Sequence, residues 1–429
     1  MLAALPFRSI HPDGHAPGPD AAPVDEEPLA THPWPMLDPS ALHGLAGDVV
    51  RAIDPQTEAD PAAVLVSFLV GFGNMAGGGP HAIGGGARHP CNEFAIVVGN
   101  TAKARKGTAW KAIRPLLELV DPDWRRTCVV TGLSSGEGLI NAVRDGERDD
   151  PATADPLAKR LLAVEEEFAR VLRVMRREGN ALSAILREAW DDGTFQVLVR
   201  TNPLRATGAH VSVLGHVTRR ELLAHLQATD ISNGLANRFL WVCARRSKKL
   251  PEGGLIDYGA ELPARVLAAL RFARGLSAPV ARDAAARAAW AEAYESLTEG
   301  SPGALGEITN RAEPHVLRLS LLYAVLDRSP LIRTEHLVAA LALWRYCEES
   351  AAAIFGPRGA DALAGTILAG VRAAGSAGLT RTAISDLLGH NRTREQIAAA
   401  LAGLIEEGLV AERREGGTGG RPRLVYHLT

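Results

Sequence analysis

A loop with the residue types needed to bind phosphate lies between an apolar strand and a helix. The segment NEFAIVVGN, residues 92–100, is a short run rich in β-branched residues and predicts a buried strand. TAWKAIRPLLELV predicts a helix after the loop. In this setting backbone N–H groups and a helix N-terminus hold phosphates, a lysine neutralises the β and γ oxygens, and a threonine reaches Mg²⁺. The predicted nucleotide-binding residues are Gly99, Asn100, Thr101, Arg105, Lys106, Gly107 and Thr108.

The match to a standard P-loop, GxxxxGK[ST], is imperfect. The distance from Gly99 to Lys106 is one residue too long, Arg105 stands where the second glycine belongs, and Gly107 separates Lys106 from Thr108. An ordinary polar turn between strand and helix is the alternative. Only 6 of the 47 basic residues are lysines, and three of these fall at 103, 106 and 111. This concentration favours a functional loop, in which either Arg105 or Lys106 meets the phosphate.

An acidic cluster ends a second apolar segment, RLLAVEEEF, at residues 165–167. P-loop ATPases need acids at a strand end, one to hold Mg²⁺ and one to orient the attacking water. We therefore predict Glu166 and Glu167 as catalytic residues, with Thr108 and Glu166 as metal ligands. The alternative is a helix start with glutamates in its first turn.

Two further segments carry candidate catalytic residues. HVSVLGHVT (210–218) predicts a buried strand between the P-loop strand and the acidic strand, with His216 as a sensor of the nucleotide. Its alternative is a core strand ending in a capping threonine. NGLANRFLW (233–241) places Arg238 before an apolar strand, which suits an arginine finger. A structural salt bridge is the alternative for Arg238.

The elements around these residues predict an α/β fold. Residues 1–33 lack apolar periodicity and predict a flexible arm. In 34–91 two helices are expected before the first strand. In 92–261 strands alternate with helices, which predicts a parallel sheet. Residues 262–357 show helical patterns only and predict a helical subdomain, followed by the linker-like FGPRGAD.

The last segment, 361–429, predicts three helices followed by two strands around a glycine-rich tip. This is the order of a winged helix-turn-helix. Basic residues stand at the start of the expected recognition helix and in the wing, so the predicted DNA-binding residues are Arg392, Arg394, Arg421 and Arg423. The alternative is that this unit mediates protein contacts only.

Composition excludes several classes of protein. The net charge of −2 excludes a uniformly basic coat protein for nucleic acid. The four cysteines show no CxxC spacing, which argues against a disulfide scaffold or a structural zinc site. Apolar stretches are too short or interrupted to span a bilayer, and no signal peptide is evident. We expect a cytoplasmic protein without membrane contact.

The ordered set of motifs resembles a P-loop, helicase-like family of bacterial, phage and plasmid proteins often found with primase domains. The resemblance rests on GNTAKARKGT, GLSSGEGLI, VEEEF, AWDDG, GHVT, NGLANRFLW and RLSLLYAVLD. It implies a RecA-like ATPase core that binds ATP and Mg²⁺ between subunits of a homo-oligomer, with the hexamer as the implied form. On this resemblance Lys106 and Thr108 take the Walker A roles. The acidic pair, the sensor and the finger correspond to the residues predicted above.

These expectations combine into an ATP-dependent, DNA-associated motor, a replicative-type helicase or helicase loader of a mobile element. DNA is the expected partner, single-stranded or duplex, with a primase as a further one. The alternative is a nucleotide-sensing, DNA-binding regulator with little ATP turnover.

Overall fold

The computed structural model describes residues 34–100, 105–146, 157–198, 203–253, 256–300, 303–356, 359–406, 409–415 and 423–428. The predicted arm at 1–33 lies outside the described residues. No helix in the described ranges combines the length and the apolar character that a membrane crossing requires.

The N-terminal region centres on a helix that is buried almost all round. It contains η1 (Pro39–Ala41), α1 (Gly44–Ile53), η2 (Asp54–Gln56) and α2 (Pro61–Ala76). The Asp60 side chain caps α2 by accepting a hydrogen bond from Ala62 N–H, and every residue of α2 after Pro61 is buried. A helix apolar on all sides is a core helix. Accordingly, α2 packs against both the sheet and α3.

A β-hairpin follows α2, so the prediction of helices alone before the first sheet strand is wrong. Strands β1 (His81–Gly84) and β2 (Ala87–Pro90) pair antiparallel through a two-residue loop. Both loop residues have positive φ, 56° at Gly85 and 79° at Gly86. This is the backbone that a tight hairpin turn requires, and glycine adopts it at no steric cost.

The prediction of a parallel α/β sheet is confirmed. Five parallel strands have the order β4-β5-β8-β3-β9. Their bounds are Val129–Val130 for β4, Arg160–Glu165 for β5, His210–Thr218 for β8, Phe94–Gly99 for β3 and Phe239–Ala244 for β9. Strand β8 lies between β3 and β5, as predicted for the sensor segment. This arrangement is compatible with a RecA-like core.

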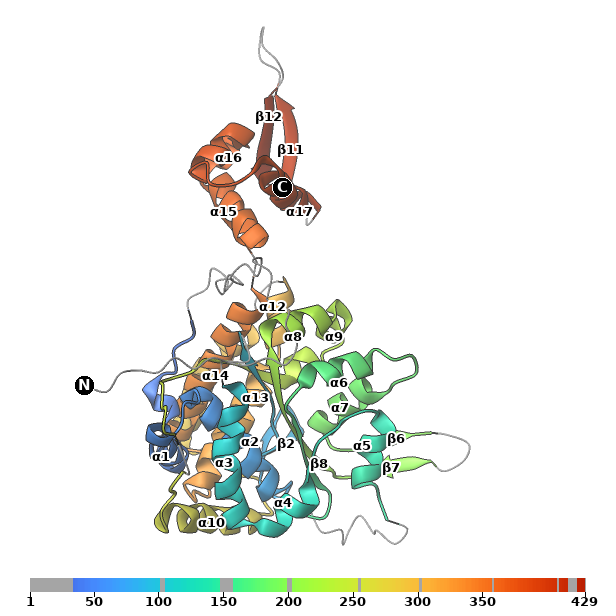
Figure 1. Ribbon diagram of the computed structural model, residues 1–429, viewed down its shortest axis with the longest axis vertical. Helices are drawn as coiled ribbons and strands as arrows, with labels where there is room; N and C mark the ends of the chain where they lie inside the picture. The colour runs from blue at the N-terminus through green and yellow to red at the C-terminus, as the bar shows by residue number, and fades with distance from the viewer. Residues whose placement is uncertain are drawn as a thin grey trace, which may run out of the picture.

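Helices cover both faces of this sheet (Figure 1). One face carries α2, α3 (Lys106–Val120) and α4 (Pro122–Cys128). The other carries α5 (Gly136–Val143), α6 (Phe168–Met175) and α7 (Leu182–Asp191). Side chains alternate along β3 accordingly, with Val97 in the first core and Ile96 in the second. Short elements complete this part: α8 (Arg219–His225), α9 (Ala228–Ser232) and η4 (Ala236–Arg238).

The alternating segment that starts at Phe195 forms a strand outside the main sheet. Strand β6 (Phe195–Val197) pairs antiparallel with β7 (Leu204–Ala206) in a separate two-stranded sheet. Alternation of apolar and polar residues predicts a strand but does not identify its partner.

The helical segment after the sheet shares a core with it. Its helices are α10 (Glu261–Arg274), α11 (Ala284–Thr298), α12 (Gly303–Thr309), α13 (Ala312–Leu326) and α14 (Thr334–Phe355). Residues of α10, α13 and α14 join α2, α3 and one sheet face in a single apolar cluster. Helix α14 packs along β9, where the Ser350 hydroxyl accepts a hydrogen bond from Cys243 N–H. It therefore covers an edge strand that would otherwise expose its backbone.

The C-terminal unit contains three helices and a three-stranded antiparallel sheet (Figure 1). The helices are α15 (Gly359–Ala374), α16 (Arg381–Leu387) and α17 (Arg394–Glu406), with η5 (Gly375–Ala377) after the first. The sheet order is β10-β12-β11, formed by β10 (Leu379–Thr380), β11 (Val410–Glu415) and β12 (Arg423–Leu428). The unit has its own apolar cluster, which includes Ile367, Ile384 and Leu401.

Candidate functional site

Gly99 ends strand β3, which lies between β8 and β9, at the carboxyl edge of the sheet. It is level with Thr218 of β8 and Ala244 of β9. From β3 the chain continues through α3 on one face, whereas from β8 it continues through α8 on the other. Open α/β sheets bind ligands at such a switch point, outside the carboxyl ends of the strands. Gly99 is buried and Asn100 exposed, whereas Thr101 lies outside the described residues.

Helix α3 starts at this edge and directs its N-terminus toward it. Its first three residues are Lys106, Gly107 and Thr108, all half-buried, after Arg105 in the left-handed conformation with φ 58°. A Cβ added at Gly107 would meet no atom within 4 Å, and Gly107 is not among the positive-φ residues. Neither packing nor backbone strain therefore requires a glycine there. Room beside a helix N-terminus is what a closely approaching anion needs.

The side chains of Arg105 and Lys106 have different environments. Arg105 Nε lies 2.8 Å from Glu58 Oε2, and Arg246 Nε lies 3.4 Å from the same oxygen. Lys106 makes no hydrogen bond or ion pair within the described part of the chain. Of the two candidates for the phosphate contact, Lys106 is therefore the one whose charge is available.

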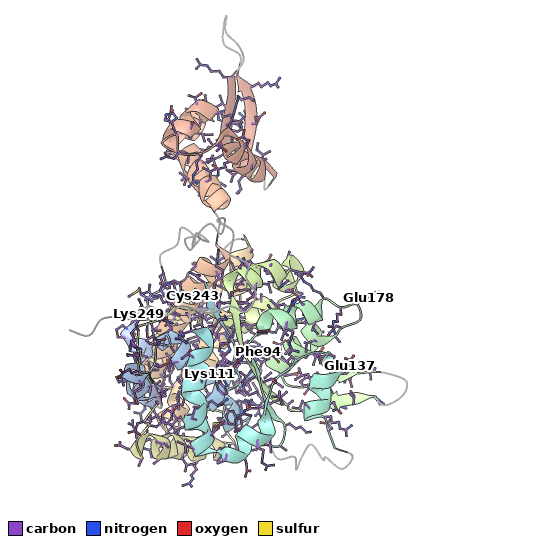
Figure 2. All side chains as sticks on the ribbon, viewed as in Figure 1. Phe94, Lys111, Glu137, Glu178, Cys243 and Lys249 are labelled. Atoms are coloured by element: carbon purple, nitrogen blue, oxygen red, sulfur yellow. The ribbon has the colours of Figure 1, made fainter. Side chains whose placement is uncertain are left out.

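His216 faces the start of α3 from the neighbouring strand β8. Its side chain is 1% exposed, and neither ring nitrogen has a hydrogen-bond partner among the described residues. Burial, and then the positive charges of Lys106 and Lys111, lower the pKa of His216 to about 4. Lys111 lies on α3 (Figure 2). A neutral imidazole with two unsatisfied nitrogens is costly to bury, which marks a site where a ligand supplies the partner.

Thr218, at the end of β8, has a structural role. Its hydroxyl accepts a hydrogen bond from Glu221 N–H at 3.3 Å and donates to Glu221 Oε2 at 2.6 Å. This is a capping box at the start of α8. The alternative interpretation of a capping threonine is correct for this residue.

The three consecutive glutamates after β5 divide by burial. Glu165 is buried, and its Oε1 accepts hydrogen bonds from the N–H groups of Gly132 and Leu133 at 2.6 and 2.7 Å. It therefore fixes the loop after β4. Glu166 and Glu167 are exposed in the turn that follows, and neither makes an ion pair in the described ranges. Glu167 is the N-cap residue of α6.

Arg238 lies at the opposite edge of the sheet. It precedes Phe239, which is level with Phe94 at the amino end of β3. Its side chain is 7% exposed and binds Asp191 through two hydrogen bonds, at 3.2 and 2.7 Å. This geometry is that of the alternative interpretation, a structural ion pair. The role as an arginine finger stays a prediction, because the pair would have to open first.

The four predicted DNA-binding arginines belong to the C-terminal unit. Arg392 and Arg394 are exposed at the start of α17, and Arg423 is exposed at the start of β12. Arg421 lies outside the described residues, as does the tip between β11 and β12. Binding of DNA by these residues stays a prediction.

Sequence patterns did not reveal a group formed by His43, Asp327 and His336, whose ligand atoms lie within 4.8 Å of one another. His336 Nδ1 accepts a hydrogen bond from Arg333 N–H, so its Nε2 carries the proton and donates toward Asp327. A metal-ligating histidine has the opposite arrangement, with the second nitrogen donating. We therefore interpret the group as a hydrogen-bonded clamp between α1, α13 and α14.

Comparison with protein-family models gives no match for this chain, and comparison with curated proteins gives none either.

Proposed function

We propose that this protein is an ATP-hydrolysing, DNA-associated motor of the P-loop, RecA-like kind, a helicase or helicase loader. The observation that carries the proposal is the buried, unpartnered His216 beside Lys106, at the switch point of the parallel sheet. A triphosphate at the N-terminus of α3 would use the free charge of Lys106. It would also give the His216 imidazole a hydrogen-bond acceptor.

The remaining residues fit a hydrolytic site. Thr108 and Glu166 offer hydroxyl and carboxylate oxygens, which are the ligands that Mg²⁺ prefers. When bound, Mg²⁺ would neutralise charge on the β and γ oxygens. Glu166 or Glu167 would accept a hydrogen bond from the attacking water and orient it toward the γ-phosphorus. The lysine ammonium would stabilise the charge that develops on the phosphoryl oxygens.

Two parts of the proposal concern partners. DNA would bind the C-terminal unit as a winged helix, through Arg392 and Arg394 at the start of α17 and Arg423 on β12. Arg238 would act on a neighbouring subunit's nucleotide in a homo-oligomer, after its pair with Asp191 opens. A primase is the further partner that the motif set suggests.

The first prediction is that Lys106→Ala lowers the rate of ATP hydrolysis at least a hundredfold. The substitution removes an ammonium at the start of α3 that has no hydrogen-bond or ion-pair partner among the described residues. Phosphate release measured under saturating ATP and Mg²⁺ checks it. Lys111→Ala is the matched control, since Lys111 is exposed on the same helix and should leave turnover within about twofold. Unchanged turnover in Lys106→Ala would sink the assignment.

A second candidate function is a nucleotide-sensing, DNA-binding regulator. The engagement of Arg105 with Glu58, at the position where a P-loop has its second glycine, favours slow turnover. Addition of single-stranded DNA to an ATPase assay separates the two functions. Strong stimulation supports the motor, whereas tight DNA binding without stimulation supports the regulator.

A further inference from the structure

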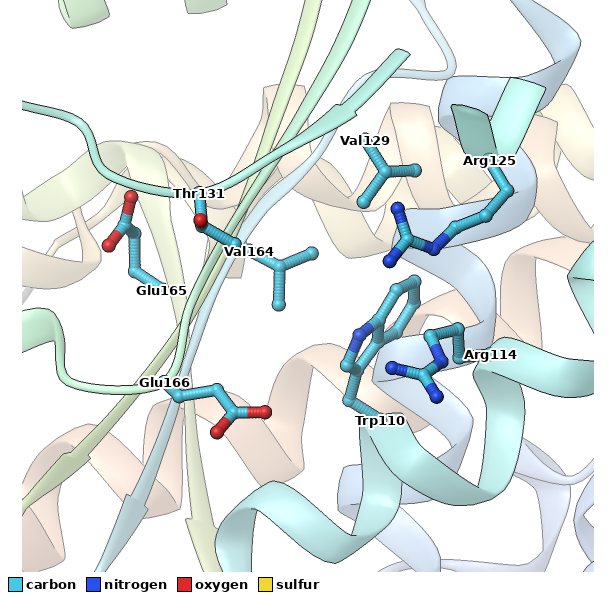
Figure 3. Close-up of a pocket in the computed structure, with 8 residues that line it drawn as sticks. All are labelled: Trp110, Arg114, Arg125, Val129, Thr131, Val164, Glu165 and Glu166. Carbon is cyan, nitrogen blue, oxygen red and sulfur yellow. The ribbon is translucent and has the colours of Figure 1, made fainter. Parts of the chain in front are cut away.

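A cavity of about 320 Å³ lies between α3, α4 and the carboxyl ends of β4 and β5. Figure 3 shows Trp110, Arg114 and Arg125 on one side and the acidic turn with Glu166 on the other. Val129, Thr131, Val164 and Glu165 complete the lining. The volume is at the lower end of the range for small-ligand sites.

The cavity extends along the helix that begins at the proposed nucleotide site. Lys106, Trp110 and Arg114 are four residues apart, so they follow one side of α3. At 1.5 Å per residue, Arg114 lies about 12 Å along the axis from Lys106. The two arginines therefore lie away from Lys106, although Glu166, a proposed metal ligand of the nucleotide site, also lines the cavity.

The two guanidinium groups carry more positive charge than their neighbour neutralises. Arg114 Nε and Arg125 Nε lie 3.4 and 2.9 Å from one oxygen of Glu118. Glu118 therefore accepts a hydrogen bond from Arg125 Nε and forms only an ion pair with Arg114, whose Nε has no hydrogen-bond partner among the described residues. Their terminal NH₂ groups make no hydrogen bond with described residues. Such terminal donors suit the oxygens of a tetrahedral anion.

The opposite side of the cavity sets a condition on the ligand. The Thr131 hydroxyl can donate to an anion, but the exposed carboxylate of Glu166 repels one. The Glu165 carboxylate also lines the cavity, but its charge is already held by the N–H groups of Gly132 and Leu133 and by Arg170. An anion held by the arginines would therefore bind against the charge of Glu166. The affinity should increase when that charge is removed.

We propose that this cavity is a second anion site, which binds a phosphate group through Arg114 and Arg125. The phosphate could belong to a nucleic-acid backbone or to a free phosphate monoester or ion. The inference does not depend on nucleotide hydrolysis at the start of α3.

The test uses the full chain in a Lys106→Ala background, so that binding at the start of α3 is weakened. Calorimetry with inorganic phosphate and fluorescence anisotropy with a labelled oligothymidylate give the two affinities. Arg125→Gln should lower affinity at least tenfold for the probe that uses the site. Arg126→Gln is the matched control, because Arg126 is the next residue, with a side chain 75% exposed. A melting curve for each variant confirms that it is folded.

Glu166→Gln tests anion binding directly, because the affinity for the probe should not change in this variant if the arginines have only a structural role. It should raise the affinity of the same probe about threefold or more. If Arg125→Gln lowers the affinity for the oligonucleotide alone, the site binds a backbone phosphate. If it lowers the affinity for inorganic phosphate alone, the site binds a free phosphate. In the Lys106→Ala background, equal affinities with and without Arg125→Gln for both probes would overturn the proposal, as would no response to Glu166→Gln.

Discussion

At the scale of single residues, unsatisfied groups are the most informative. His216 has two buried nitrogens without hydrogen-bond partners among the described residues. Lys106 makes no ion pair with a described residue, whereas Arg105 beside it is paired with Glu58. A sequence selected only for stability would fill such positions with apolar or paired side chains. We therefore place the chemistry at His216 and Lys106.

The second prediction is that His216→Leu separates stability from activity. At pH 7.5 the free energy of unfolding should be equal to or above that of the wild type, because two unsatisfied buried nitrogens are removed. ATP turnover should fall at least tenfold. Urea unfolding and phosphate release measure the two quantities on one preparation. A variant that loses stability and keeps its turnover would assign His216 to the core alone.

The same substitution should change the pH dependence of stability. The pKa of His216 is lowered to about 4 in the folded state against 6.5 ordinarily, so the unfolded chain binds the proton more tightly. The stability that depends on a neutral His216 is fully present above pH 6.5 and is lost as the pH falls toward 4. By linkage, the free energy of unfolding should fall by about 2 kcal/mol more for the wild-type protein than for His216→Leu when the pH is lowered from 7.5 to 5. Parallel pH profiles would contradict the lowered pKa.

At the scale of elements, helix α3 connects the loop after β3 to the core. Its apolar residues pack against α2 and the sheet, which fixes the direction in which its N-terminus points. Gly107 stands in its first turn with open space around the position of a Cβ. A glycine there reduces helix stability without a packing reason.

The third prediction concerns Gly107→Ala. The substitution should leave the free energy of unfolding unchanged or raise it by up to about 1 kcal/mol, as expected for glycine replaced by alanine in a helix. ATP binding measured by calorimetry should weaken at least tenfold, because the methyl group would occupy the space of the phosphates. Gly365→Ala in α15 is the control, since a Cβ there also meets nothing within 4 Å. Equal ATP affinity in both variants would contradict the placement of the phosphates.

Local patterns predicted the central strands, but not every pairing. Apolar runs identified β3, β5, β8 and β9, because buried parallel strands have a distinct composition. The β1–β2 hairpin was missed although Gly85 and Gly86 are a turn signal, since each strand has only four residues. The hydrogen bonds from the N–H groups of Gly132 and Leu133 to Glu165 could not be predicted, because they join residues about thirty positions apart in the sequence.

Side-chain roles were harder to predict than strands. Arg238 has the sequence context of a finger, yet its partner Asp191 comes from α7, a contact that spacing does not reveal. The cavity with Arg114 and Arg125 was also missed. Its only sequence signal was the four-residue spacing of Lys106, Trp110 and Arg114.

At the scale of the whole molecule, two apolar clusters flank the sheet, and a third belongs to the C-terminal unit. The candidate nucleotide site lies at the sheet. The exposed Arg392 and Arg394 lie in the C-terminal unit, just before and at the start of α17. Near-neutral net charge therefore coexists with local basic surfaces.

The fourth prediction is that Arg392→Ala with Arg394→Ala weakens DNA binding and leaves basal ATP turnover unchanged. If each arginine contacts one phosphate, the slope of log affinity against log salt should fall by about 2. Anisotropy titrations over a range of salt concentrations measure it. Arg372→Ala, exposed at the end of α15, is the control. An unchanged slope in the double variant would instead favour a unit that binds protein.

The most direct test of the nucleotide site is a crystal structure of the full chain with a non-hydrolysable ATP analogue and Mg²⁺. We expect the γ-phosphate to lie within hydrogen-bonding distance of Lys106 Nζ and a ring nitrogen of His216, with Glu58 still bound to Arg105. An analogue bound elsewhere, or one held by Arg105 with Lys106 in solvent and His216 still unpartnered, would contradict this account.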